Sequence, residues 1–125
     1  MHGLLVTIAL NEHGALTDGQ VVTILVGLGM VLLELHRRGE AFGPIHPAHV
    51  AVAEDGRPFL RPVTTPIGWT AHDDWVGLLR FGRLLGSGPG AFELDWQVAG
   101  RREGVDLLRW LMRWARPAPL PILLD

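Results

Sequence analysis

Two histidines three residues apart, His46 and His49, are the side chains whose types and spacing most readily suggest chemistry in this sequence. Imidazole nitrogens are common metal ligands, and together with His72 and Asp73 or Asp74 they could form a site of nitrogen and oxygen ligands. No recognised zinc spacing is present, however. We therefore favour the simpler interpretation, in which both are ordinary loop histidines.

Several kinds of catalysis are excluded by residues that the sequence lacks. It contains no cysteine, which removes disulfides, thiolate zinc sites and thiol nucleophiles. Its 11 basic residues are all arginine, and without lysine neither a Walker-A phosphate site nor Schiff-base chemistry is available. Ser87, the single serine, lies in the glycine-rich stretch 86–90 without a local base. We assign no catalytic triad, no metal and no cofactor.

The composition favours one packed domain over residues 1–125. Hydrophobic residues make up 48% of the chain and charged residues 19%, with a formal net charge of -2. Neither disorder nor electrostatic binding of nucleic acid fits this balance. The absence of cysteine suits a reducing compartment, and the first residues lack the features of a signal peptide, so we expect a cytoplasmic protein.

A long helix is specified at both of its ends. Thr17 and Gln20 form a capping box at its start, and Gly39 can close it in the left-handed conformation after Arg38. Its apolar residues cover nearly all faces, which predicts neighbours on most sides. The apolar run 21–33 is shorter than a membrane span requires, so a buried helix is preferred over membrane association.

A small sheet and two further helices complete the expected fold, which is mainly α with a small β-hairpin, an α+β class. Gly27 and Gly29 permit a neighbour to approach the long helix closely. Pro58 and Pro62 place the second hairpin strand at an edge. The predicted elements are a strand over 4–10, hairpin strands over 50–53 and 58–61, a helix capped by Asp73 or Asp74 and ending near Leu85, an amphipathic helix from Arg102 to about Ala115, and an extended tail over 116–124.

This order of elements resembles the large, C-terminal lobe of a protein kinase of the bacterial serine/threonine type. The stretch from Gly14 to His36 is similar to the helix that precedes the catalytic loop, and residues 42–50, Phe-Gly-Pro-Ile-His-Pro-Ala-His-Val, stand where the family has His-Arg/Gly-Asp-Leu-Lys-Pro-Glu-Asn-Ile. The resemblance is strongest over 14–60 and implies a truncated lobe, because nothing here supplies the small N-terminal lobe.

The resemblance also implies that the catalytic positions are degenerate. Pro44 takes the place of the catalytic aspartate, His46 that of the lysine and His49 that of the metal-holding asparagine. The metal-binding Asp-Phe-Gly falls on Pro62-Val63-Thr64. Phosphoryl transfer depends on charge neutralisation and positioning by these groups, so we expect no kinase activity.

A structural role for an acidic residue follows from the same resemblance. Asp73 or Asp74 could be a general base, yet in the resembled fold an aspartate at this place accepts hydrogen bonds from the backbone of the catalytic loop. Because buried loop N–H groups are rarely left unpaired, we favour this duty over chemistry.

We therefore expect a catalytically inactive module for protein interaction or scaffolding, as a homodimer or as a subunit of a complex. Apolar residues at Ile45, Val50 and Val52 suggest a covered patch. The alternative is a nucleotide- or metal-binding sensor or enzyme that uses the His46/His49 loop. The candidate interface residues are Trp110 and Trp114 on the last helix and Leu120, Ile122 and Leu123 in the tail.

Overall fold

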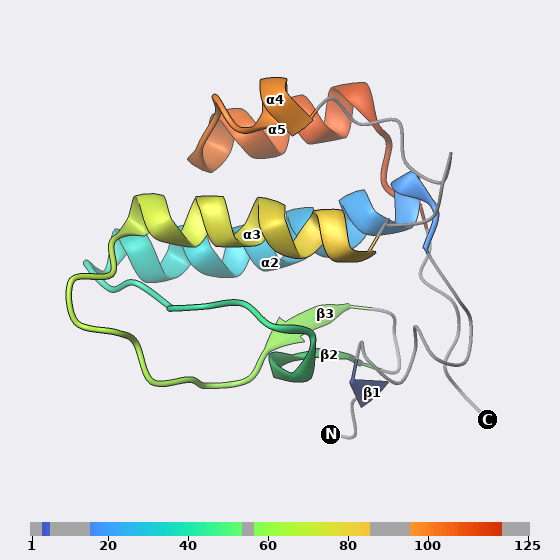
Figure 1. Ribbon diagram of the computed structural model, residues 1–125. Coiled ribbons are helices and arrows are strands. Elements are labelled where there is room, and N and C mark those ends of the chain that lie inside the picture. Colours follow the sequence, from blue (N-terminus) through green and yellow to red (C-terminus); the bar gives the residue numbers. More distant parts are fainter. Residues whose placement is uncertain (1–3, 6–15, 54–56, 86–95, 119–125) are drawn as a thin grey trace.

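The computed structural model describes residues 4–5, 16–53, 57–85 and 96–118 (Figure 1). The described chain is mainly helical with a small antiparallel sheet, as the sequence predicts. Its elements are β1 (Leu4–Leu5), α2 (Asp18–Arg37), a 3₁₀ turn η1 (Pro47–His49), β2 (Val50–Val52), β3 (Pro58–Leu60), α3 (Ala71–Leu85), α4 (Trp96–Ala99) and α5 (Gly104–Trp114).

The predicted hairpin is confirmed, and a third strand flanks it. The sheet has the order β1-β2-β3 with antiparallel pairing throughout. Val50 pairs with Leu60 and Val52 with Pro58, so the proline-containing strand lies at the edge of the described sheet. Of the predicted strand 4–10, Leu4 and Leu5 pair with β2, and the remainder lies outside the described residues.

Both predicted ends of α2 are confirmed. The Gln20 side chain accepts from the Thr17 N–H at 3.1 Å, and the Thr17 hydroxyl accepts from the Gln20 N–H at 3.2 Å. At the other end Gly39 has φ 79°, and its N–H donates to the His36 carbonyl at 3.0 Å. The next N–H, that of Glu40, reaches the Leu35 carbonyl at 2.9 Å, which completes a Schellman closure.

Helix α2 lies at the centre of the fold. Figure 1 shows α3 beside it, α4 and α5 on one side of this pair and the sheet on the other. Besides Gly19, where a Cβ would lie 2.8 Å from Ala118 Cβ, two glycines of α2 are closely approached by other elements, where the sequence predicts one such approach. A Cβ on Gly27 would lie 2.6 Å from Pro58 Cγ in β3, and one on Gly29 would lie 2.5 Å from Leu108 Cδ2 in α5. Glycine therefore lets both a strand and a helix pack against the α2 backbone.

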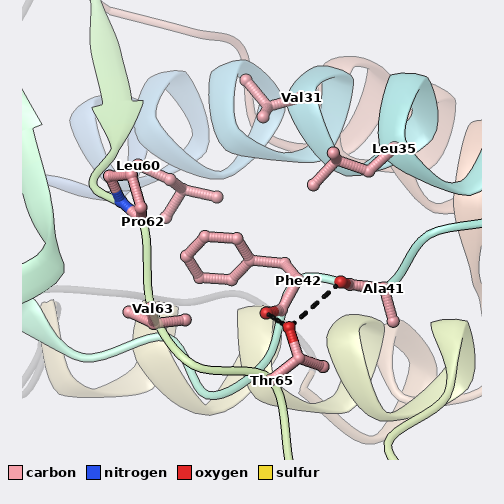
Figure 2. Close-up of a pocket in the computed structure, with 8 residues that line it drawn as sticks. All are labelled: Val31, Leu35, Ala41, Phe42, Leu60, Pro62, Val63 and Thr65. Atoms are coloured by element: carbon pink, nitrogen blue, oxygen red, sulfur yellow. Dashed lines mark hydrogen bonds between the residues drawn. The ribbon is translucent and has the colours of Figure 1, made fainter.

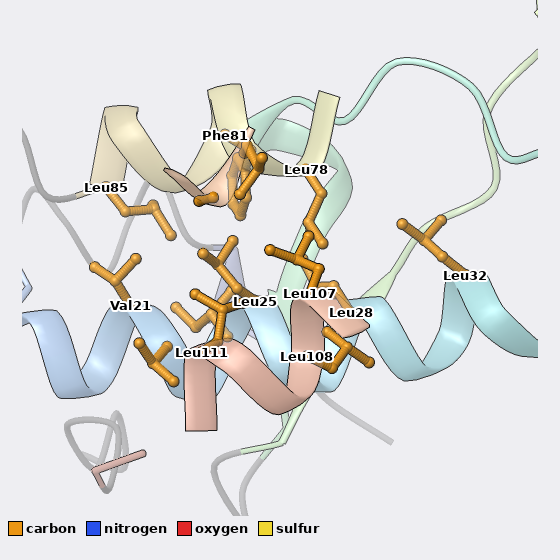
Figure 3. Packing of buried hydrophobic residues seen from close by; sticks show 14 of the residues in the cluster. Val21, Leu25, Leu28, Leu32, Leu78, Phe81, Leu85, Leu107, Leu108 and Leu111 are labelled. Atoms are coloured by element: carbon orange, nitrogen blue, oxygen red, sulfur yellow. The ribbon is translucent and has the colours of Figure 1, made fainter. Parts of the chain in front are cut away.

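The core forms where α2, α3 and α5 meet. Leucines of the three helices interdigitate with Phe81 between them (Figure 3). The fully buried large side chains are Phe81, Ile24, Leu25, Leu28, Leu32, Leu78, Leu85, Leu107, Leu111, Val21 and Val22. Burial on this scale supplies the principal favourable free energy of folding.

Burial corrects two expectations. Val50 and Val52 are 0% and 5% exposed and belong to the core, so they form no surface patch, and Ile45 is half-buried against the same core. Conversely, α2 is less enclosed than its composition indicates, because Met30 is 63% exposed.

By length and composition, α2 is also long and apolar enough to cross a membrane, with a mean hydropathy of 1.7. A central core helix has the same properties, because it must present apolar side chains to several neighbours. In the fold α2 packs against α3, α5 and β3, and seven of its residues are buried.

The ends of α3 and α5 differ in detail from the prediction. Thr70 rather than either aspartate precedes α3. The Thr70 hydroxyl accepts from the Asp73 N–H at 3.3 Å, and the Asp73 side chain accepts from the Thr70 N–H at 2.8 Å.

The sequence does not predict the short helix α4. The loop 86–90 lies outside the described residues. After α5, the Ala118 N–H donates to the Thr23 hydroxyl at 2.8 Å, which ties the end of the described chain to the start of α2.

Candidate functional site

A fully buried carboxylate, that of Asp74 on α3, organises the centre of the histidine- and proline-containing loop. Its Oδ2 accepts from the Phe42 N–H at 2.8 Å, and its Oδ1 accepts from the Gly43 N–H at 3.0 Å. The Trp69 indole N–H donates to Oδ1 at 2.8 Å. Of the two aspartates proposed as loop supports, Asp74 makes these bonds, and the Asp73 side chain bonds Thr70 instead.

A histidine from α2 completes the surroundings of Asp74. His36 Nε2 lies 2.8 Å from Asp74 Oδ2, and the His36 ring meets the Trp75 ring edge-on, with 5.5 Å between centroids. The carboxylate therefore links α2, the loop and α3 through four polar contacts. A buried charge is tolerated when its oxygens are satisfied in this way.

The loop backbone adopts a conformation at Gly43 that a larger residue would strain. Gly43 is buried with φ 120°, and a Cβ there would lie 3.3 Å from Val63 Cγ2. This conformation aims its N–H at Asp74. The adjacent Pro44 is exposed, so this position carries an apolar ring at the surface.

His46 shapes the next part of the loop. Its Nδ1 accepts from the Ala48 N–H at 3.1 Å, which caps the 3₁₀ turn, and the His49 N–H returns to the His46 carbonyl at 2.8 Å. The Arg61 N–H then donates to the His49 carbonyl at 2.7 Å, which fastens the loop to the end of β3, the second strand of the hairpin. One nitrogen of His46 is thus used within the fold.

The two loop histidines do not assemble the metal site that the sequence allowed. Their ring centroids lie 5.8 Å apart, and His49 Nδ1 is buried without a hydrogen-bond partner in the described part of the chain. His72 bonds Glu103 at 2.9 Å instead, and this carboxylate raises the pKa of His72. Within residues 4–5, 16–53, 57–85 and 96–118, no group of three His, Cys, Asp or Glu side chains is placed to hold a metal ion.

An apolar pocket lies beside the loop, between α2 and the segment after β3 (Figure 2). Its volume is about 330 Å³, and the Phe42 ring projects into it between Leu60 and Leu35. Thr65 closes one side, because its hydroxyl donates to the Phe42 carbonyl at 2.6 Å. The lining residues are Val31, Leu35, Ala41, Phe42, Leu60, Pro62, Val63 and Thr65.

An exposed apolar residue follows the pocket wall along the same segment. Pro62 forms part of that wall. Five residues further on, Ile67 is fully exposed at the tip of a turn that the Trp69 N–H closes on the Pro66 carbonyl at 3.1 Å. Since Trp69 is also bonded to Asp74, this turn is fixed to the loop support.

The aromatic residues expected at an interface lie on α5. Trp110 and Trp114 stack with 5.9 Å between centroids and 15° between ring planes, and Trp114 is 44% exposed. The Arg102 guanidinium lies 5.8 Å from the Trp110 ring centroid. The other candidate interface residues, Leu120, Ile122 and Leu123, lie outside the described residues.

Sequence reasoning missed the pocket and the role of His36. His36 and Asp74 are 38 positions apart, and no local pattern reports a contact over that separation. The sequence signal for this contact is a histidine in the last turn of an otherwise apolar helix. A histidine at that place is equally typical of a helix end, where the dipole favours cations. A scan against models of protein families finds none that matches this chain, and no curated protein matches its sequence.

Proposed function

We propose that this protein is a catalytically inactive remnant of a kinase-like large lobe that works in the cytoplasm as a protein-interaction or scaffold module. The order of the elements supports the kinase-like part: a capped helix, a proline-containing loop, a hairpin and a helix whose aspartate holds the loop. The observation that carries the proposal is the contact of Asp74 with the Phe42 and Gly43 N–H groups. It is the kind of support that the resemblance implies for a catalytic loop, and it would keep such a loop in shape after its reactive positions were replaced.

The loss of chemistry follows from those positions. Pro44 offers no carboxylate to orient a hydroxyl group, and Pro62 offers none to hold magnesium. One ring nitrogen of His46 already accepts a hydrogen bond from the backbone of its own turn. With no lysine anywhere in the chain, no ammonium group can pair with a phosphate. Each missing group carries a large share of the rate of phosphoryl transfer, so their combined loss leaves binding as the available activity.

The interaction part of the proposal rests on the pocket face, defined by Val31, Phe42, Pro62 and Val63, and on Ile67 further along the same segment. An open apolar pocket and a fully exposed isoleucine on the segment that follows β3 are features that protein contacts cover. A second copy of the chain is the first partner to test, because a two-fold contact would place each Ile67 against the pocket of the other copy.

Two measurements test this function. Incubation with γ-labelled ATP and Mg²⁺ is expected to transfer no phosphate to the chain or to a generic substrate, and transfer would refute the inactive assignment.

Sedimentation velocity over a range of concentrations is expected to show a dimer that Val31→Asp weakens. Met30→Asp is the matched control, because Met30 is the exposed neighbour on α2 that does not line the pocket.

A sensor that binds a metal or a nucleotide through the His46/His49 loop remains the alternative. The buried Nδ1 of His49, which no described residue bonds, favours it, because a bound metal ion or nucleotide could satisfy this atom. Calorimetric titration with Zn²⁺ separates the two functions. Saturable binding that is lost in His49→Gln and kept in His72→Gln would favour the sensor.

A further inference from the structure

The outward face of α5 carries a second binding surface, distinct from the pocket face. We propose that this surface binds an acidic, amphipathic segment of a partner protein. The inference rests on the proposed interaction function and adds to it the chemistry of a partner. We define the arginine–tryptophan face by Arg109, Arg113, Arg116, Trp110 and Trp114.

The three arginines form an exposed stripe. Their spacing of four and three residues places them on one side of the helix and its exit, and all three are exposed. None of them makes an ion pair with another described residue, whereas Arg102, which precedes α5, is paired with Asp106 at 3.1 Å. Clustered guanidinium groups repel one another, so a face of this kind is stabilised when carboxylates approach it.

The two tryptophans form a stacked aromatic pair along one side of this stripe. Trp110 and Trp114 follow Arg109 and Arg113 by one residue each, and their rings are stacked on one another. The half-exposed Trp114 presents apolar surface at little entropic cost, because the stack already fixes its side chain. Tryptophan and arginine are the residues most enriched among those that dominate binding energies at protein interfaces.

A membrane surface fits this face less well than a protein does. A helix that lies in a bilayer inserts its apolar side, and here that side, Leu107, Leu108 and Leu111, is buried in the core. Nucleic acid also fits poorly. Affinity for nucleic acid depends on how many phosphates are neutralised, and the three arginines of the stripe would neutralise few of them.

The matching ligand is therefore a segment with carboxylates on one side and an apolar residue beside them. Carboxylates can form paired hydrogen bonds with guanidinium groups, and the apolar residue would lie on the Trp114 ring. Such a segment needs a spacing of three or four residues between its acidic side chains, which an amphipathic helix provides.

The test is fluorescence anisotropy with two labelled synthetic peptides, one of glutamate and leucine at helical spacing and one with glutamine in place of glutamate. The full chain is expected to bind the glutamate peptide in a salt-sensitive way and to leave the glutamine peptide unbound. The triple variant Arg109→Gln, Arg113→Gln and Arg116→Gln is expected to lose about tenfold or more in affinity. Trp114→Ala is expected to lose roughly fivefold.

The control is Arg80→Gln with Arg83→Gln on α3. Both arginines are exposed and make no ion pair with a described residue, so their replacement removes two positive charges from another face, against three in the triple variant. An equal loss in this control would reduce the effect to net charge and overturn the proposal. So would tighter binding of phosphatidylserine vesicles or duplex DNA, or no binding of the glutamate peptide. These results leave the proposed function itself intact, because phosphate transfer and dimer formation are measured separately.

Discussion

At the scale of single residues, Asp74 decides the shape of the loop. Its two oxygens bind two consecutive backbone N–H groups, an indole N–H and an imidazole, and they do so at 0% exposure. Hydrogen bonds to a charged acceptor are stronger than those to a neutral one, and the donors would be left unsatisfied without it. The role of Asp74 is therefore architectural, and substitution at this residue should be felt across three segments of the fold.

We expect Asp74→Asn to destabilise the protein by about 2–4 kcal/mol, because the amide NH₂ would face donors that now meet a carboxylate oxygen. The measurement is the midpoint and slope of unfolding in urea. Asp73→Asn is the control, since Asp73 lies one residue away and serves only the start of α3 in the described fold. Equal losses of free energy in the two variants would contradict the account.

A pH dependence belongs to the same scale. The Glu103 carboxylate raises the pKa of His72 above its usual 6.5, so the charged pair stabilises the fold below pH 6.5 and the contribution is lost as pH rises through the raised pKa. We expect the difference in Tm between the wild type and His72→Gln to be largest below pH 6.5 and to shrink at higher pH. A difference that grows with pH would refute this pairing.

At the scale of elements, α2 is defined by its ends and by its glycines. Its capping box and its glycine closure are both local patterns, which is why the sequence alone predicts its start and end. The sequence predicts an aspartate as the cap of α3, whereas the cap is Thr70, which bonds reciprocally with Asp73. Helix α4 has four residues, too few for apolar periodicity to be visible.

Two glycines in helices should respond in opposite ways to the same change. In Gly27→Ala the new methyl group would meet the rigid ring of Pro58, so we expect a loss of about 1–3 kcal/mol in the free energy of unfolding. In Gly77→Ala on α3 nothing lies within 4 Å of the new Cβ, so we expect a gain of about 0.5–1 kcal/mol from helix propensity. Thermal unfolding of both variants checks this, and stabilisation by Gly27→Ala would disprove the close packing of β3 on α2.

At the scale of the whole molecule, the fold joins segments that are distant in sequence. The hairpin, its edge strand and the mainly helical class were predictable because strand and helix patterns are local. The pocket and the contact between His36 and Asp74 were not, because each requires knowing how α2, the loop and α3 pack. The same limit explains Val50 and Val52, whose apolar side chains indicate a buried or covered face without saying what covers it.

At this scale, the function proposed above implies that a kinase-like frame would persist without the groups that hold a nucleotide and its metal. Titration of the purified chain with ATP and Mg²⁺, followed by thermal shift, tests it most directly. A ligand that binds only the native state raises Tm once its concentration exceeds its dissociation constant, and the rise continues as the concentration increases. We predict no shift at millimolar ATP with Mg²⁺. A concentration-dependent rise in Tm that requires both ATP and Mg²⁺ would contradict the account.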